Sequence, residues 1–300
     1  MGKLPWTLLL IASMAGIAAF YPIVKTFNGA VDPYLIAFLR FSIASIVLVP
    51  VMIHQHSLYL PQKRDWPFFT FIAFCAVAPT ALIAMGIEST NSVVAAILTN
   101  SNSLIVAIFA VTFIGEEISR RKIIGLGLGF LGVVFIVLNG NNPFVYIDST
   151  YIWGSLILLL AAVLSALSKT YSKAYVRTYT GLYVTFLSVT LGSLLLGVFT
   201  ATREGFGSVS EITSSVMLSM LVIGVIGTAI PWVIWNSSLK HLDVHVAASF
   251  NLLIPVFAAL YSFIFFEESF TIWMFAGFIL TSFGIYLIQR REASIVAPAL

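Results

Sequence analysis

Polar residues inside long apolar segments are the positions where this chain could bind a solute, because hydrocarbon offers a polar group no partner. Asn100, Ser101, Asn102 and Ser103 follow one another near the middle of one apolar segment, and Asn251 lies at a comparable place in another. Two interpretations stay open for these side chains. The amides of Asn100, Asn102 and Asn251 contact a solute at mid-membrane, or they only join neighbouring helices through hydrogen bonds of about 0.6–2 kcal/mol.

Aromatic and cationic side chains extend this set of candidates. Trp232 and Trp235 stand three residues apart and therefore share a helix face, and Tyr21 is a candidate for the facing wall of a cavity. Arg40 lies about 10 Å into the membrane, at a depth where a charge costs about 2.5–3.5 kcal/mol. It either contacts a solute or extends to the interface. Lys169, near the end of its segment, is expected to extend to the interface.

Four prolines are expected to interrupt helices: Pro22, Pro79, Pro231 and Pro255. A proline lacks the N–H that would bond to the carbonyl one turn earlier, so that carbonyl is freed. The freed carbonyl either coordinates a ligand or marks a helix that is merely curved.

Residue patterns that would indicate an enzyme are not visible. His241 and His245 stand four apart, but no cysteine or carboxylate cluster accompanies them, so we expect surface histidines and no metal site. The sequence contains no phosphate-binding glycine loop and no nucleophile–base pair that we can identify. We therefore expect no catalytic residues, no cofactor and no nucleic-acid partner.

The elements that position these residues are membrane-spanning helices. The chain is 60% apolar and only 9% charged, whereas a soluble domain carries about 25% charged residues. Its apolar runs have the length of about 20 residues that a helix needs to cross a bilayer. The predicted fold is an all-α integral membrane protein with ten spans: Trp6–Phe27, Pro33–Ile53, Pro67–Ile87, Asn91–Ile114, Lys122–Leu138, Tyr151–Tyr171, Gly181–Ala201, Thr213–Leu239, Val244–Phe266 and Thr271–Ile288.

The cationic residues of the loops predict the orientation. Only Lys25 and Arg203 lie on one side of the ten spans, and Arg40 lies within a span. All the other Lys and Arg residues lie on the same side of the membrane as the two termini. This distribution predicts that both termini are cytoplasmic and that the protein lies in the cytoplasmic (inner) membrane. These others are Lys3, Lys63, Arg64, Arg120, Arg121, Lys122, Lys169, Lys173, Arg177, Lys240, Arg290 and Arg291.

The sequence repeats itself with an offset of 152 residues, the separation of Pro79 and Pro231. In this register Glu116 matches Glu268. Each glutamate opens a turn into a helix, where it is expected to cap amides in a structural role. Five spans per repeat is an odd number, so the two repeats cross the membrane in opposite directions. We predict repeats at 1–139 and 149–290, an extracytoplasmic linker at 140–148 and a cytoplasmic tail at 291–300.

Glu116 is followed by Gly125 and Gly132, and in the same register Glu268 is followed by Gly277 and Gly284. This doubled pattern resembles the drug/metabolite transporter superfamily, specifically its ten-span members with two tandem EamA-type repeats. Two positions depart from the family pattern: Ala18-Ala19 stand where Trp-Gly is common, and Ser103 replaces the proline expected in the fourth span. The residues that carry the resemblance are Glu116 with Gly125 and Gly132, Pro255 with Glu268, Gly277 and Gly284, and Arg40 within Leu39-Arg40-Phe41.

The resemblance implies a secondary transporter that moves a small metabolite, such as an amino acid, an amine or an aromatic compound, by alternating access. Export is the expected direction, and coupling to a proton gradient or to exchange is left open. The expected partners are the small-molecule substrate and the lipid bilayer. Two other classes stay in view: a membrane enzyme acting on lipid-linked substrates, and a membrane scaffold that transports nothing.

Overall fold

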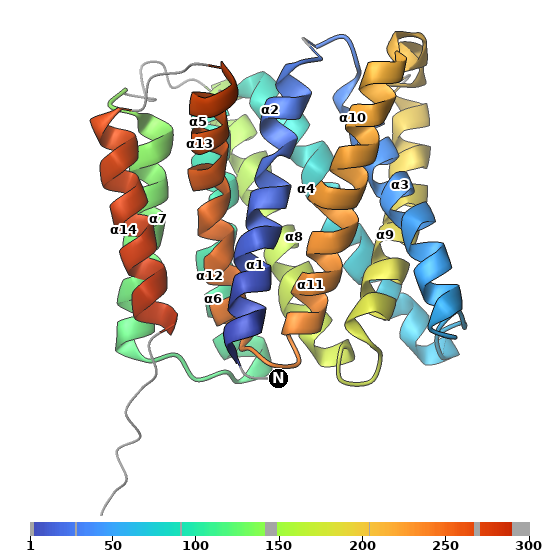
Figure 1. Cartoon of the computed structure of the whole chain (residues 1–300), viewed down its shortest axis with the longest axis horizontal. Helices are drawn as coiled ribbons and strands as arrows, with labels where there is room; N and C mark the ends of the chain where they lie inside the picture. Colours follow the sequence, from blue (N-terminus) through green and yellow to red (C-terminus); the bar gives the residue numbers. More distant parts are fainter. Residues whose placement is uncertain are drawn as a thin grey trace, which may run out of the picture.

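A computed structural model of the chain describes residues 3–27, 29–90, 92–141, 149–203, 205–266 and 271–289. Every secondary-structure element assigned within these residues is helical (Figure 1). The first half contains α1 (Lys3–Ala18), α2 (Phe20–Lys25), α3 (Pro33–His54), η1 (Lys63–Asp65), α4 (Trp66–Ser89), α5 (Ser92–Asn100), α6 (Asn102–Ile114) and α7 (Arg120–Leu138). The second contains α8 (Ser149–Tyr175), α9 (Gly181–Thr202), η2 (Gly205–Glu211), α10 (Ser214–Gly224), η3 (Val225–Ala229), α11 (Ile230–Ser238), α12 (Val244–Ser249), η4 (Phe250–Leu253), α13 (Ile254–Phe266) and α14 (Ile272–Gln289).

These helices form ten membrane spans, as the sequence predicts. Within the described residues, ten helical segments of 18 to 27 residues are long and apolar enough to cross a bilayer. Side chains such as Leu8, Ile46, Leu194 and Phe265 are exposed on the outside of the bundle, as a surface facing lipid requires. We call the face on which α1 begins, at the bottom of Figure 1, the N-terminal face, and the other the opposite face.

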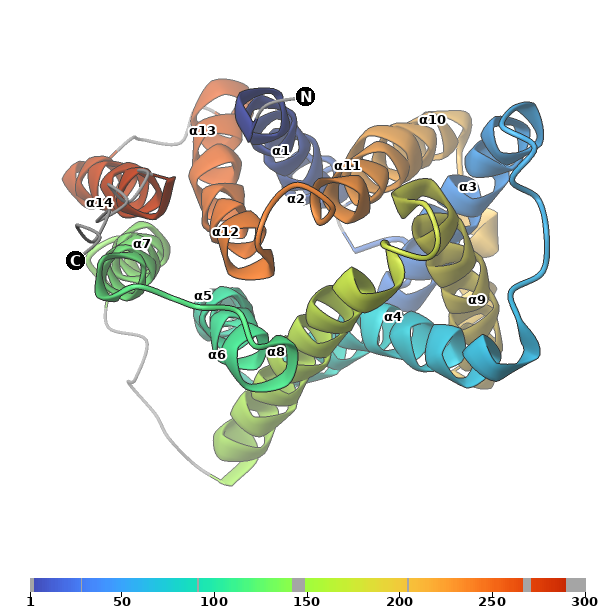
Figure 2. The same cartoon turned by 90° about the horizontal axis from the view of Figure 1, so that it is seen from below.

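Contacts between the two halves hold the bundle together. The pairs α3 with α9, α4 with α8 and α7 with α14 each join one half to the other. Figure 2 shows the α7–α14 pair at one end of the bundle and α3, α9 and α10 at the other.

Glycines let α7 and α14 approach closely, and their pattern has the symmetry of an inverted repeat. A Cβ atom added at Gly125 would lie 2.7 Å from the carbonyl oxygen of Gly284, and one added at Gly132 would lie 2.6 Å from that of Gly277. In the 152-residue register Gly125 matches Gly277 and Gly132 matches Gly284. Each contact is therefore the copy of the other under exchange of the halves, as a two-fold axis between them demands.

Three of the spans are interrupted just before a proline. A break at Ala19 separates α1 from α2 ahead of Pro22, the π-helical η3 precedes Pro231, and the 3-10 helix η4 precedes Pro255. The prediction of an interruption at Pro79 is wrong, since α4 continues through this residue from Trp66 to Ser89. One missing N–H removes a single bond from this helix, and the neighbouring turns hold it in place.

The fourth span is interrupted without a proline. A turn at Ser101 separates α5 from α6, and in the repeat register this position matches Leu253 of η4. Ser103, which stands where the proline is expected, donates a hydrogen bond of 3.1 Å to the carbonyl oxygen of Ala248 in α12. The two interrupted spans therefore contact each other at their breaks.

Candidate functional site

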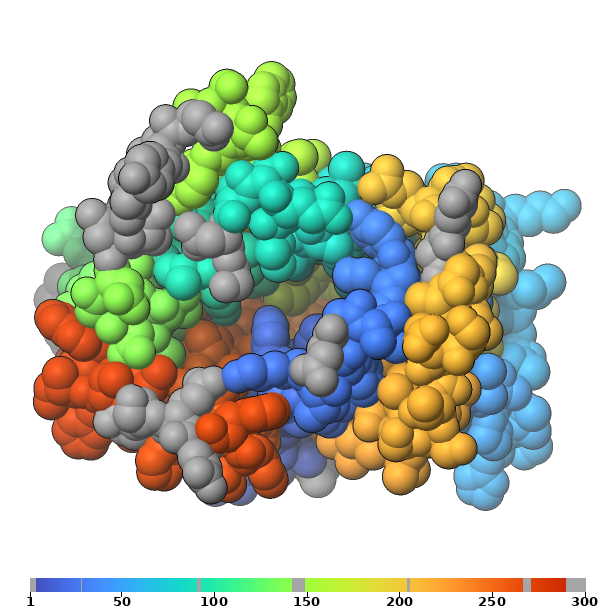
Figure 3. All heavy atoms as spheres, turned by 90° about the horizontal axis from the view of Figure 1, so that it is seen from above, coloured from blue at the N-terminus to red at the C-terminus, as the bar shows by residue number. Residues whose placement is uncertain are grey.

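A cavity of about 200 Å³ lies where the two halves of the molecule meet. Its walls come from α1, α3 and α4 of the first half and from α8, α9, α11, η4 and α13 of the second. Above it, the opposite face is hollowed between the segments coloured blue (α1 to α3), teal (α5) and orange-red (α13) in Figure 3. Sites of drug-sized ligands have volumes of about 300–1,000 Å³, so this cavity is suited to a smaller, metabolite-sized solute.

Four of the predicted solute-binding residues line this cavity: Arg40, Trp232, Trp235 and Asn251. Trp232 packs edge-to-face on Phe41 with ring centroids 5.4 Å apart, so α11 and α3 share an aromatic wall. The Asn251 side chain is buried and donates a 3.0 Å hydrogen bond to the carbonyl oxygen of Ala248. Pro79 and Pro231 lie in the same walls.

The other predicted contacts are not among the lining residues. Tyr21 is exposed and packs against Phe20, and Pro22 and Pro255 lie outside the cavity. The Asn100 amide donates a 2.8 Å hydrogen bond to the carbonyl oxygen of Ala96 in its own helix. Asn102 does not line the cavity but contacts a residue that does, because its Oδ1 accepts a 3.3 Å hydrogen bond from Lys169 Nζ.

Lys169 is the residue that sequence analysis misplaced. It does not extend to the interface: it lines the cavity, with Nζ 5.6 Å from the centre of the Trp235 ring. Ser165, Ser168 and Ser172 line the cavity from the same helix. Their spacing of three, one and three residues around Lys169 places all four on one face of α8, and this polar stripe was the signal available in the sequence.

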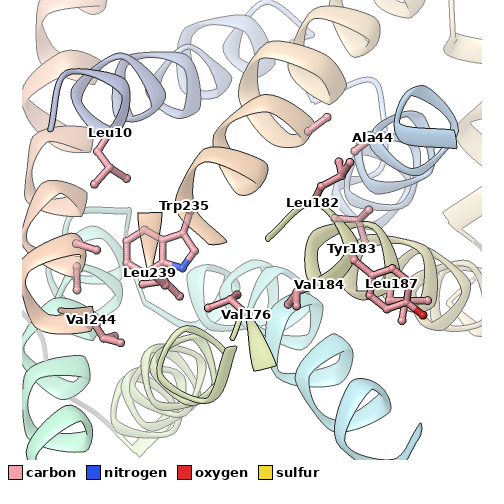
Figure 4. Packing of buried hydrophobic residues seen from close by; sticks show 14 of the residues in the cluster. Leu10, Ala44, Val176, Leu182, Tyr183, Val184, Leu187, Trp235, Leu239 and Val244 are labelled. Atoms are coloured by element: carbon pink, nitrogen blue, oxygen red, sulfur yellow. The ribbon is translucent and has the colours of Figure 1, made fainter. Parts of the chain in front are cut away.

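Apolar side chains close the molecule between the cavity and the N-terminal face. Leu10, Val176, Leu239, Leu242 and Val244 are all at most 5% exposed, and we call them the apolar plug. They belong to one packed cluster with Trp235, a wall residue of the cavity. Figure 4 shows four of them around Trp235, coming from segments far apart in the sequence.

A cluster of charged residues lies beside the apolar plug. The Glu116 carboxylate accepts a 2.6 Å hydrogen bond from Lys173 Nζ and a 2.7 Å bond through Nδ1 of His245. Its Oε1 also accepts a 2.8 Å bond from the backbone N–H of Val244, the first residue of α12. Lys122 Nζ lies 3.2 Å from His245 Nε2 on the far side of the ring. Glu116 thus joins the first half to two segments of the second.

This environment keeps Glu116 ionised. Burial alone would raise the pKa of the carboxyl group, but the hydrogen bonds from His245, Lys173 and Val244 and the charge of Lys173 outweigh it and lower the pKa to about 2. The sequence predicts that Glu116 caps amides of the helix it opens. It caps α12 of the other half instead, a partner that sequence spacing could not reveal. Glu268 lies outside the described residues.

One of the two histidines differs from the expectation of a surface position, whereas His241 is exposed as expected. His245 is fully buried inside this cluster, because α12 begins beneath the loop of Glu116. His241 stacks on Trp6 with ring centroids 4.9 Å apart. Within the described part of the chain, no three His, Cys, Asp or Glu side chains are placed to hold a metal ion.

Comparisons with known proteins agree with this architecture. A solved crystal structure superposes with a TM-score of 0.81 over 95% of this chain and 96% of its own, at 17% identity. An uncharacterized transporter of Archaeoglobus fulgidus is 26% identical over 95% of this chain and 97% of its own. A probable terminal-alkyne amino-acid exporter of Streptantibioticus cattleyicolor is 24% identical over 97% of this chain and 95% of its own.

The family assignment rests on both halves of the molecule. The model of the EamA-like transporter family matches residues 4–138 and again 152–290. These two matches cover most of the chain, and each corresponds to five spans of the structure. The chain therefore belongs to the EamA-like transporter family.

Proposed function

We propose that this protein is a secondary transporter that moves a small metabolite across the cytoplasmic membrane by alternating access, with export as the expected direction. One observation carries the proposal. A cavity lined by both halves lies beneath the hollowed face, and the apolar plug separates it from the N-terminal face. In an inverted repeat, exchanging the conformations of the two halves would open the closed face and close the hollowed one.

The Glu116 cluster and the apolar plug are the parts that would have to separate in this exchange. Glu116 holds the start of α12 through Val244 and holds α8 through Lys173. Moving α12 away from α8 would break these bonds and let water reach the cavity from the N-terminal face. A buried ion pair that can be exposed to water is suited to this role, because its net contribution to stability is smaller than its Coulomb energy.

The excess of Lys and Arg on the N-terminal face supports a cytoplasmic location of that face. In this orientation the described conformation would be open to the outside. The printed name of the Streptantibioticus relative supports a solute of amino-acid size. The experiment below tests whether transport is coupled to a proton gradient or to exchange.

The test is transport by the purified protein in liposomes, with a panel of amino acids, amines and organic acids, each with and without an imposed proton gradient. We expect accumulation of one solute class. Trp232→Ala and Asn251→Ala should each reduce it at least about tenfold at limiting solute, with near-normal protein yield. Trp153→Ala is the matched control, because Trp153 is 67% exposed on the outside of α8. Wild-type transport by both cavity variants would place the solute elsewhere.

A further inference from the structure

On the basis of the transport function proposed above, we infer that the cavity selects a small amphipathic carboxylate, and that Lys169 and Arg40 are the residues that recognise its negative charge. Both side chains line the cavity, Lys169 from α8 and Arg40 from α3. All lining residues belong to the described part of the chain, and none of them is Asp or Glu. The charge of the cavity wall is therefore positive.

Lys169 differs from the lysine one helical turn further along α8. Lys173 is fully compensated, with Glu116 at 2.6 Å and Asp243 at 3.8 Å. Among the described residues, the partners of Lys169 are the neutral Asn102 oxygen at 3.3 Å and the Trp235 ring. Of its three N–H donors, one is directed at Asn102 and the others are available to a ligand.

Arg40 is likewise held by neutral groups. Its guanidinium lies 5.0 Å from the centre of the Phe20 ring and 5.2 Å from that of Phe41. Its buried Nε atom has no hydrogen-bond partner among the described residues. The aromatic faces stabilise the charge, but within the described structure they leave Nε–H without an acceptor. Nε–H is one donor of the planar guanidinium fork, which matches the two oxygens of a carboxylate.

A cation without a counter-charge inside the membrane has a high free-energy cost, so a functional role is needed to explain Lys169 and Arg40 at this depth. A purely structural role would have been met by a carboxylate partner, as it is for Lys173. Water could solvate both cations while the cavity is open to one face. An anionic solute in the cavity would compensate both charges while the loaded cavity is closed to both faces.

The rest of the cavity indicates what the carboxylate is attached to. Trp232, Trp235 and Phe41 form an aromatic wall suited to an apolar or aromatic body. Two buried atoms of the lining, Oδ1 of Asn236 and Oγ of Ser188, have no partner within the described structure. Both are neutral and can accept a hydrogen bond from the solute, and the Ser188 hydroxyl can also donate one, but neither supplies the negative charge that a simple amine would require.

The experiment compares three solutes with the same phenyl group: 3-phenylpropanoate, its neutral amide 3-phenylpropanamide, and the cationic 2-phenylethylamine. Their binding to the detergent-purified full chain is measured by titration calorimetry at neutral pH. We expect the carboxylate to bind at least about tenfold more tightly than the other two, because hydrogen bonds to charged groups are the stronger ones. Equal or tighter binding of the amide or the amine would overturn the inference.

Variants assign the recognition to the two cations. Lys169→Met and Arg40→Gln should each weaken carboxylate binding at least about tenfold and leave amide binding within about twofold. Lys169→Arg should retain the preference for the carboxylate. Lys63→Met is the matched control, since Lys63 is exposed outside the cavity. An unchanged ratio of carboxylate to amide affinity in both cation variants would contradict their role.

The outcome is separable from the transport function. If none of the three phenyl solutes binds while the wider panel shows transport of amines alone, the substrate class inferred here is wrong and the transporter stands. If no solute of the panel is transported and none of the three binds, both proposals fail.

Discussion

At the scale of single residues, Glu116 is the centre of the buried charge cluster, because it makes more of the hydrogen bonds described there than any other side chain. Its two oxygens meet Lys173, the His245 ring and the first N–H groups of α12. A carboxylate at a helix N-terminus stabilises the helix through both the free N–H groups and the helix dipole. Since α12 belongs to the other half, this stabilisation acts on the closed arrangement of the two halves.

We predict that Glu116→Gln lowers the stability of the purified protein by about 3–5 kcal/mol, because Lys173 is left buried without its counter-charge. The measurement is the thermal unfolding midpoint in detergent. Glu117→Gln is the matched control, since the neighbouring carboxylate is exposed. Equal midpoints for the two variants would show that the Glu116 cluster does not hold the molecule together.

The pH dependence follows from the lowered pKa. The carboxyl group has a pKa of about 2 in the folded protein, against an ordinary value of 4.5. The stabilisation from Glu116 is therefore complete above about pH 4.5 and is lost as the pH falls towards 2. The difference in midpoint between wild type and Glu116→Gln should be full at pH 7 and smaller at pH 3. A difference that grows on acidification would contradict this account.

Part of the cavity could be predicted from the sequence at this scale, and part of it could not. Trp232 and Asn251 stood out because aromatic and amide groups are conspicuous in an apolar segment. Lys169 was missed because its distance from the helix end was read as proximity to the interface. In the structure α8 extends to Tyr175, beyond the predicted end at Tyr171, so Lys169 lies deeper than expected. A helix end displaced by four residues is enough to change the environment of a lysine.

At the scale of elements, the number and type of helices followed from the sequence, because a bilayer fixes both the length and the polarity of a span. The irregular turns did not follow. The fourth span is interrupted at Ser101 with no proline, and α4 continues through Pro79. Packing against neighbouring helices determines whether a helix is interrupted at such a residue. The local sequence does not reveal this packing, because the packed segments are distant in the chain.

The α7–α14 pair gives a prediction at this scale. Gly132→Leu should separate the two helices and destabilise the protein by about 1–3 kcal/mol or more, because the added side chain meets the Gly277 backbone. Gly127→Leu is the matched control on the same helix, since a Cβ added at Gly127 has nothing within 4 Å. The thermal midpoints of the two variants decide it. Equal midpoints would contradict the close approach of α7 and α14.

At the scale of the whole molecule, the orientation in the membrane is a separate prediction. The distribution of Lys and Arg predicts that the N-terminal face is cytoplasmic and that Asn141 lies outside. In a Cys75→Ser background, which removes the only cysteine, Asn141→Cys in intact cells should react with a membrane-impermeant thiol reagent. Reaction only after the cells are opened would reverse the proposed orientation.

The central claim is that one cavity is exposed in turn to the two sides of the membrane. Ser165 is suited to test it, because it lines the cavity and cysteine differs from serine by one atom. Leu160→Cys on the lipid-facing side of the same helix is the control, since Leu160 is 49% exposed among other apolar side chains. Both are made in the Cys75→Ser background, and a membrane-impermeant thiol reagent is applied to right-side-out and to inverted vesicles.

The account predicts that Ser165→Cys reacts from both sides, that a transported solute slows both reactions, and that Leu160→Cys reacts from neither. Reaction of Ser165→Cys from one side only, in the presence and in the absence of solute, would contradict alternating access through this cavity.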